Sequence, residues 1–186
     1  ASLGAVKRYR MAAAQALGYE IDPGRPVFAL KATAEPSLIP AGPFSALAVN
    51  TSRDEKLWPE DSWIQIGRRL AGEGLRSVLF WGNDTEHERV KRIAAAIPGA
   101  EVAPRKGLAQ TAACLAKAEA VFGVDTGLAH LGAALGRPSV GIFVSTPTEI
   151  LKLIGDGPVL SLGGVGECPS VDQVWDAYKS VTGEQA

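Results

Sequence analysis

The stretch from Ala120 to Val144, AVFGVDTGLAHLGAALGRPSVGIFV, constrains the fold more than any other part of the sequence. Its two ends, Ala120–Val124 and Ser139–Val144, are short apolar runs typical of buried strands. Between them leucines recur at helical spacing, and a Gly-Arg-Pro turn at 136–138 ends the helix. The stretch therefore predicts a βαβ unit, in which a helix joins two parallel strands.

Small and polar residues join the first of these strands to the helix. Asp125, Thr126 and Gly127 occupy the turn, and His130 follows within the helix, where it can face the same crevice. Free N–H groups at a helix N-terminus carry partial positive charge and attract anions, and glycine lets a phosphate approach the backbone closely. Asp and Thr are also common N-caps, so an ordinary helix start explains the turn as well.

A second polar segment follows the apolar run Phe44–Asn50, which we interpret as a central strand. Thr51, Ser52 and Lys56 come directly after it. Open α/β sheets bind ligands at the carboxyl ends of their strands, and a lysine there can reach a phosphate as a compact positive charge. The alternative is a charged loop without a ligand that leads into the helix predicted from Pro59.

A third segment follows the apolar strand Ser77–Trp81. Glu86 stands near the start of the next helix, for which Asp84 or Thr85 is the expected N-cap. An acidic residue in the first turn suits the helix dipole. The functional alternative is that the Glu86 carboxylate accepts hydrogen bonds from ribose hydroxyls, as acidic residues do in dinucleotide folds. His87, beside it, is predicted to lie on the surface.

The order of the predicted elements indicates the fold class. Strands alternate with helices, which favours an α/β fold with a Rossmann-like, doubly wound parallel sheet covered on both faces. In a 3-2-1-4-5-6 strand order, the first and fourth strands are neighbours at the switch point. The segments at 51–52 and 125–127 then meet at one crevice, with Glu86 one strand further out. The strands are predicted at Phe44–Asn50, Ser77–Trp81, Ala100–Ala103, Ala120–Val124, Ser139–Val144 and Pro158–Leu162, with a further edge strand at Val27–Leu30.

Composition excludes several classes of function. The chain has 186 residues, 46% of them hydrophobic, which suits one globular domain with a sizeable core. A net charge of −1 gives no support to nucleic-acid binding. The sequence has no apolar run of about 18 residues, so we expect no membrane-spanning segment, and it has no recognisable signal peptide. Cys114 and Cys168 match no metal spacing.

Common cofactor motifs are missing from the sequence. It contains neither G-x-G-x-x-G nor a Walker lysine loop, which argues against binding of NAD and hydrolysis of ATP. It also contains no D-x-D, so we expect no metal and no cofactor, only a donor substrate.

Three motifs resemble those of a known family. DTGLAHLGAALGRPSVGIF, from Asp125, is similar to the donor-site signature of the ADP-heptose:lipopolysaccharide heptosyltransferases, glycosyltransferase family 9. TSRDEKLWP, from Thr51, resembles the family's second signature, whose Thr and Lys contact the donor diphosphate. The W-G-x-x-x-E run ending at Glu86 resembles the one whose Glu serves the ribose. Gly132 stands where the family often has Thr or Ile, and Ser145–Glu149 replaces a G-P-T-D-P-like run, which leaves a sugar contact from this loop open.

The resemblance implies the C-terminal, donor-binding half of a GT-B glycosyltransferase. Residues 1–20 would form a linker helix from an N-terminal domain, with Ser2 as N-cap, and residues 21–186 the donor-binding domain. The implied reaction is inverting, metal-independent transfer of heptose from ADP-heptose to the Kdo of the lipopolysaccharide inner core. Lys56 would stabilise the leaving phosphate. The implied donor-binding residues are Thr51, Ser52, Lys56, Glu86, Asp125, Thr126, Gly127 and His130.

The resemblance also implies what this chain lacks. The Kdo–lipid A acceptor site and the general base belong to the family's N-terminal domain, so we expect no sugar transfer by this chain alone. The full-length enzyme would be cytoplasmic and peripheral at the inner face of the inner membrane. The first residue is Ala1 rather than Met, which fits a fragment or a processed chain. Two alternatives stay open: another GT-B enzyme that uses a UDP-sugar, and a non-catalytic nucleotide-sugar binding module.

Overall fold

The computed structural model describes residues 4–22, 24, 26–36 and 38–183. Six strands form one sheet in the order β3-β2-β1-β4-β5-β6, and every neighbouring pair is parallel. The predicted Rossmann-like, doubly wound sheet is therefore confirmed. The strands are β1 (Phe44–Ala48), β2 (Arg76–Leu79), β3 (Glu101–Val102), β4 (Ala120–Val124), β5 (Ser139–Phe143) and β6 (Val159–Gly163).

The centre of the sheet consists of β1, β4 and β5, whose residues are buried along their whole length. Burial on both faces explains why these strands are almost entirely apolar, with Ser45 and Ser139 as the buried exceptions, and do not alternate with polar residues. Several strand ends depart from prediction, and β1 itself ends at Ala48, two residues before the predicted Asn50. β2 ends at Leu79, β3 has only two residues, and β6 runs one residue further, to Gly163.

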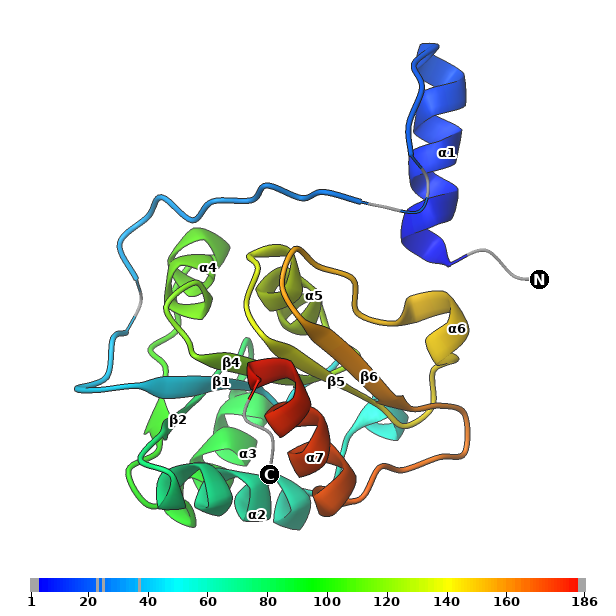
Figure 1. Cartoon of the computed structure of the whole chain (residues 1–186). Helices are drawn as coiled ribbons and strands as arrows, with labels where there is room; N and C mark the ends of the chain where they lie inside the picture. Colours follow the sequence, from blue (N-terminus) through cyan, green and yellow to red (C-terminus); the bar gives the residue numbers. More distant parts are fainter. Residues whose placement is uncertain (1–3, 23, 25, 37, 184–186) are drawn as a thin grey trace.

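Helices cover both faces of the sheet (Figure 1). On one face, α2, α3 and α7 pack with side chains such as Leu47 and Phe122 into the largest core cluster. On the other face, α4 and α5 pack against Val78 and Val121. The helices are α1 (Ala5–Leu17), α2 (Glu60–Gly72), α3 (Asp84–Ala95), α4 (Leu108–Leu115), α5 (Gly127–Ala134), α6 (Thr148–Leu151) and α7 (Val171–Thr182), with a short 3-10 helix, η1 (Asp54–Lys56). None of the described helices is long and apolar enough to cross a membrane.

Small residues set the position of α5 against β4. A Cβ atom on Gly132 would lie 2.8 Å from both γ-methyl groups of Val121, and one on Gly123 would lie 2.7 Å from the Cβ of Ala129. The helix can therefore approach the strand only because these side chains are missing. This packing gives a physical reason for glycine at 132, and it fixes where α5 begins.

The start of α3 differs from prediction. The N-cap is Asn83, whose Oδ1 accepts a hydrogen bond from Glu86 N at 2.9 Å, so Asp84 and Thr85 are helical residues and neither is the cap. Asn caps helices as well as Asp does, and an acid in the first turn then faces the positive end of the dipole. The effect is to place Glu86 three residues after the cap.

The segment before β1 is irregular. α1 begins after Gly4, and its predicted cap, Ser2, lies outside the described residues. Figure 1 shows α1 standing apart from the sheet, joined to it by an extended connection. The edge strand predicted at residues 27–30 is wrong: Phe28 N and Ala29 N donate to the two carboxylate oxygens of Asp156, at 3.0 and 2.8 Å. Ala29 also has φ of 48°, which no strand accommodates.

Candidate functional site

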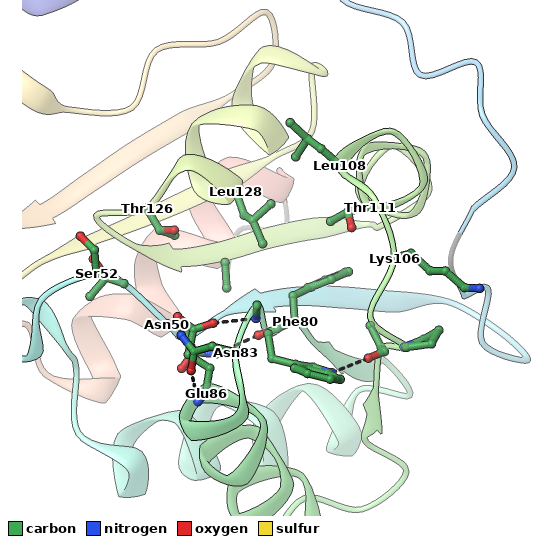
Figure 2. A pocket seen from close by; sticks show the side chains of 16 residues that line it. Asn50, Ser52, Phe80, Asn83, Glu86, Lys106, Leu108, Thr111, Thr126 and Leu128 are labelled. Carbon is green, nitrogen blue, oxygen red and sulfur yellow. Dashed lines mark hydrogen bonds between the residues drawn. The ribbon is translucent and has the colours of Figure 1, made fainter.

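A cavity of about 620 Å³ lies at the carboxyl ends of β1, β2 and β4. Asn50, Thr51 and Ser52 line it after β1, residues 80–83 and Glu86 line it after β2, and Thr126 lines it at the start of α5. Figure 2 shows these side chains around one space. The cavity thus stands at the switch point of the sheet, where the strand order reverses and open α/β sheets bind ligands.

The loops after β1 and β4 are joined beside this cavity. Thr51 Oγ1 donates a hydrogen bond to the backbone oxygen of Asp125 at 2.9 Å. Four of the eight predicted donor-site residues line the cavity itself, namely Thr51, Ser52, Glu86 and Thr126. The other four are Lys56, Asp125, Gly127 and His130. They do not line it, but they belong to the same two loops and the helix start that follows.

Lys56 and Asp125 form a partly buried ion pair. Lys56 ends η1, and its Nζ lies 2.6 Å from Asp125 Oδ2; the two side chains are 15% and 11% exposed. Thr146 Oγ1 donates to the same Oδ2 at 2.8 Å. His130 Nε2 lies 3.9 Å from Oδ1, beyond hydrogen-bond distance in this arrangement. Lysine and carboxylate therefore meet between two loops that are distant in the sequence.

These neighbours determine the charge of Asp125. His130, Lys56 and Thr146 together hold the pKa of the Asp125 carboxyl well below its usual range, although burial acts in the opposite direction. Of the three, Lys56 and Thr146 are at hydrogen-bond distance. The carboxylate is therefore ionised at neutral pH.

The start of α5 is not capped by a side chain. Thr126 is the N-cap residue but its side chain makes no capping hydrogen bond. The Asp125 carboxylate is directed to Lys56 instead. The interpretation of this turn as an ordinary helix start is therefore confirmed for the N-cap position of Thr126 and wrong for the capping hydrogen bond. A Cβ atom on Gly127 would meet nothing within 4 Å, so the space before the helix is open. Free N–H groups at a helix N-terminus can donate hydrogen bonds to an anion that enters this open space.

The wall formed after β2 is rigid. Glu86 Oε2 accepts from Gly82 N at 2.7 Å, which folds the carboxylate back over the loop. Trp81 Nε1 donates to the backbone oxygen of Ala103 at 2.7 Å. His87 stacks on the Trp81 ring with a centroid separation of 3.9 Å. His87 is thus half-buried against this ring, so its predicted surface position is confirmed only in part.

Three residues near the site were not found by sequence reasoning. Asn50 lines the cavity, Thr146 contacts Asp125, and Arg89 contacts Asn50. A polar residue that ends a buried strand was a usable signal for Asn50. Thr146 lies in the loop where the family motif is not kept, so the motif gave no signal there. Arg89 had none, because an arginine on a polar helix is ordinarily solvated.

The described residues contain no group of three or more His, Cys, Asp or Glu side chains placed to hold a metal ion. Lys56 and the start of α5 are cationic features next to the cavity, and Lys106 lines the cavity itself. A doubly wound sheet with a cavity and cationic groups at its switch point is typical of nucleotide-binding Rossmann-like domains, and this chain belongs to that class.

Comparison with known proteins identifies the family within that class. The sequence profile of glycosyltransferase family 9 (heptosyltransferase) matches residues 2–174, and the chain therefore belongs to this family. Lipopolysaccharide heptosyltransferase 1 of Escherichia coli K12 is 38% identical over 148 residues, which cover 79% of this chain and 46% of that protein. The Pseudomonas aeruginosa protein of the same name is 37% identical over 142 residues, covering 76% and 40%. The aligned segments thus cover less than half the length of these curated relatives.

Solved structures agree with the family assignment. E. coli heptosyltransferase WaaC with ADP superposes with a TM-score of 0.77 and 31% sequence identity, over 94% of this chain and 55% of that one. WaaC with ADP-2-deoxy-2-fluoro heptose gives a TM-score of 0.72 and 32% identity, over 100% and 57%. The six-stranded parallel sheet is therefore that of the GT-B heptosyltransferases.

Proposed function

We propose that this chain binds ADP-heptose, as the donor-binding part of an enzyme that transfers heptose to the inner core of lipopolysaccharide. The observation that carries the proposal is the pairing of Lys56 with Asp125, directly before the uncapped start of α5 and beside a cavity large enough for a nucleoside. Relatives solved with ADP and with an ADP-heptose analogue support the choice of nucleotide.

The proposed roles follow the positions of the groups. The diphosphate lies between Lys56 and the first N–H groups of α5, with Ser52 as a hydroxyl donor and with Thr51, whose own proton goes to Asp125 O, holding the two loops together. Gly127 leaves room for the phosphate, and Asp125, Thr126 and His130 shape this end of the site. Glu86 accepts from ribose hydroxyls further along the cavity. The charges are complementary, since the anionic diphosphate of the donor lies against the Lys56 ammonium group and the N–H groups at the start of α5.

The proposed reaction is inverting. An acceptor hydroxyl attacks the anomeric carbon of the heptose and gives its proton to the general base, while the bond from that carbon to the β-phosphate oxygen breaks and its electron pair leaves on ADP. Negative charge grows on the departing phosphate, where Lys56 and the α5 amides stabilise it without a metal ion. The general base and the Kdo–lipid A site are assigned to a part of the full-length enzyme outside this chain. We place that enzyme in the cytoplasm, peripheral at the inner membrane.

Titration calorimetry of this chain with ADP, UDP, GDP and CDP tests the proposal. We expect ADP to bind most tightly, and Lys56→Ala to weaken it by about tenfold or more, which is about 1.4 kcal/mol. Lys91→Ala is the matched control, because Lys91 pairs with Glu88 on the exposed side of α3 and should leave binding unchanged.

The outcomes separate the alternatives. Tighter binding of UDP would favour a UDP-sugar enzyme of the same fold. Absence of nucleotide binding, or equal affinity of the wild type and Lys56→Ala, would overturn the assignment. Sugar transfer by this chain without further protein would contradict the placement of the general base elsewhere.

A further inference from the structure

The side-chain amide of Asn50 is held in one orientation. Asn50 follows β1 and is 8% exposed. Its Nδ2 donates to the backbone oxygen of Phe80 at 2.9 Å, and its Oδ1 accepts from Arg89 Nη1 at 3.1 Å. A carbonyl only accepts and a guanidinium only donates, so both partners require the same assignment of oxygen and nitrogen. A flipped amide would lose both bonds.

This orientation leaves one hydrogen-bond donor unused. The Nδ2 group has two protons, and only one is directed to Phe80. No hydrogen bond of the second proton is found among the described residues. Asn50 nevertheless lines the cavity, where Figure 2 shows it on the same wall as Glu86. A buried donor without an acceptor is costly, so a ligand oxygen in this cavity gains by supplying one.

Asn50 and Glu86 are anchored to the same short segment of backbone. The Phe80 carbonyl holds the Asn50 amide, and the Gly82 amide holds the Glu86 carboxylate at 2.7 Å. One side chain offers a proton and the other offers only lone pairs. A hydroxyl group satisfies both at once, because it accepts through its oxygen and donates its own proton. A phosphate oxygen would satisfy the amide but would repel the carboxylate.

We propose that Asn50 is a binding residue for a ribose hydroxyl of the donor nucleotide, which accepts from Asn50 Nδ2 while it donates to Glu86. This proposal rests on the proposed function, because it takes the ligand of the cavity to be a nucleotide. It assigns to Asn50 a contact that the sequence motifs do not include. The ribose is then recognised as a donor and an acceptor together, from β1 and from α3.

Arg89 is the positioning residue for this contact. Its side chain is only 17% exposed, and Nη2 lies 3.7 Å from Asp54 Oδ1 while Nε lies 3.9 Å from Glu60 Oε1. The guanidinium therefore stands between the carboxylates of η1 and α2 and the amide of Asn50. Without it, the amide loses the partner that fixes its oxygen, and it can turn its donor away from the cavity.

Calorimetry with ADP, 2′-deoxy-ADP and 3′-deoxy-ADP tests this contact. Asn50→Ala should lower the affinity for ADP by roughly fivefold, which is the usual effect of losing one neutral hydrogen bond. The same substitution should weaken binding of the analogue that lacks the contacted hydroxyl by less than about twofold, because that contact is already missing. Equal weakening of all three nucleotides, or of none, would overturn the proposal.

Failure of the contact can be told from failure of the proposed function. If the wild type binds no ADP, both fall. If it binds ADP and Asn50→Ala acts equally on the deoxy analogues, only the Asn50 assignment falls. Thr111→Val is the matched control, since Thr111 lines the same cavity but bonds to Gly107 O. It should leave the preference for the ribose hydroxyls unchanged.

Arg89→Met tests the positioning role. We expect it to lower the preference for ADP over the critical deoxy analogue, and to have no further effect on that preference in an Asn50→Ala background. A purely structural residue would weaken all nucleotides alike, and that result would overturn its role. Arg89→Lys and Asn50→Ser, with urea unfolding of each variant, provide folded alternatives if one substitution disrupts the chain.

Discussion

Lys56 Nζ and Asp125 Oδ2 lie 2.6 Å apart although 69 residues separate them in the sequence. The contact joins the loop after β1 to the loop after β4, and Thr146 adds a third chain segment at the same oxygen. Asp125 therefore restrains the lysine that we assign to the donor phosphate. A lysine ammonium group has three protons, so Lys56 keeps donors for an anion while it is paired.

Asp125→Asn should destabilise the fold by about 2 kcal/mol, because it leaves Lys56 charged and largely buried without its anion. Urea unfolding measures the change. Asp172→Asn is the control, since Asp172 pairs with Arg69 while 77% exposed and should cost less than about 0.5 kcal/mol. Equal effects of the two substitutions would show that the Lys56–Asp125 pair adds no stability.

Stability should fall in acid with a contribution from Asp125. The pKa of this carboxyl is lowered by folding, so its contribution is complete above the unfolded-state pKa of about 3.9 and is lost as the pH falls toward the lower folded value. In that window the unfolded chain binds a proton that the folded chain does not. The free energy of unfolding then changes by up to about 1.4 kcal/mol per pH unit. Urea titrations at pH 7, 4 and 3 should show a shallower decline below pH 4 for Asp125→Asn than for the wild type.

Gly127→Ala should separate binding from stability. The added methyl group meets no protein atom within 4 Å, and alanine is the better helix residue, so the free energy of unfolding should stay equal or rise slightly. The same methyl would occupy the space that we assign to the phosphate, and ADP affinity should drop by roughly tenfold or more. Calorimetry measures the ADP affinity, and urea unfolding of the same sample measures the free energy of unfolding. Unchanged affinity would place the phosphate elsewhere.

Gly132→Ala should destabilise the protein by about 1 kcal/mol despite the better helix propensity of alanine, because its methyl group would press on Val121. Gly72→Ala gives the opposite expectation. That position is helical and a Cβ atom there meets nothing within 4 Å, so stability should rise by about 0.5 kcal/mol. Thermal unfolding of both variants compares the signs, and a gain at Gly132 would refute the close packing of α5 on β4.

Asp156→Ala should release the segment before β1 without unfolding the sheet. The carboxylate accepts hydrogen bonds from Phe28 N and Ala29 N, and both amides lose their acceptor when it is removed. Hydrogen exchange at these two amides should become faster, while exchange in β4 stays as in the wild type. Unchanged protection at Phe28 and Ala29 would show that another group holds the segment.

The sheet was predictable because its central strands are buried on both faces. A strand such as Ala120–Val124 must then be apolar throughout, and the alternation with helices leaves few topologies. The ends of elements were less predictable, as Asn83 shows. Any of the three neighbouring polar residues Asn83, Asp84 and Thr85 can begin a helix, and only the backbone geometry decides which one caps it.

The site was predicted in part for a related reason. Thr51 and Asp125 follow predicted strands, so the strand order alone brings them together, and the hydrogen bond between their loops confirms this. The contact of Thr146 with Asp125 depends on the path of an irregular loop, which residue patterns do not determine. The same holds for the Asn83–Glu86 turn and for the arginine behind Asn50. Whether these residues bind a donor stays a prediction for the experiments above.

The parallel pairing of β1 with β4 also has a consequence for how the protein is made. The groups assigned to the diphosphate span Thr51 to Gly127, so a nascent chain cannot assemble them until at least Gly127 and the start of α5 have left the ribosome. Binding of a nucleotide to a chain still in synthesis would therefore indicate that β1 and β4 have already paired. The bound nucleotide would then stabilise this pairing, because it binds only the folded arrangement.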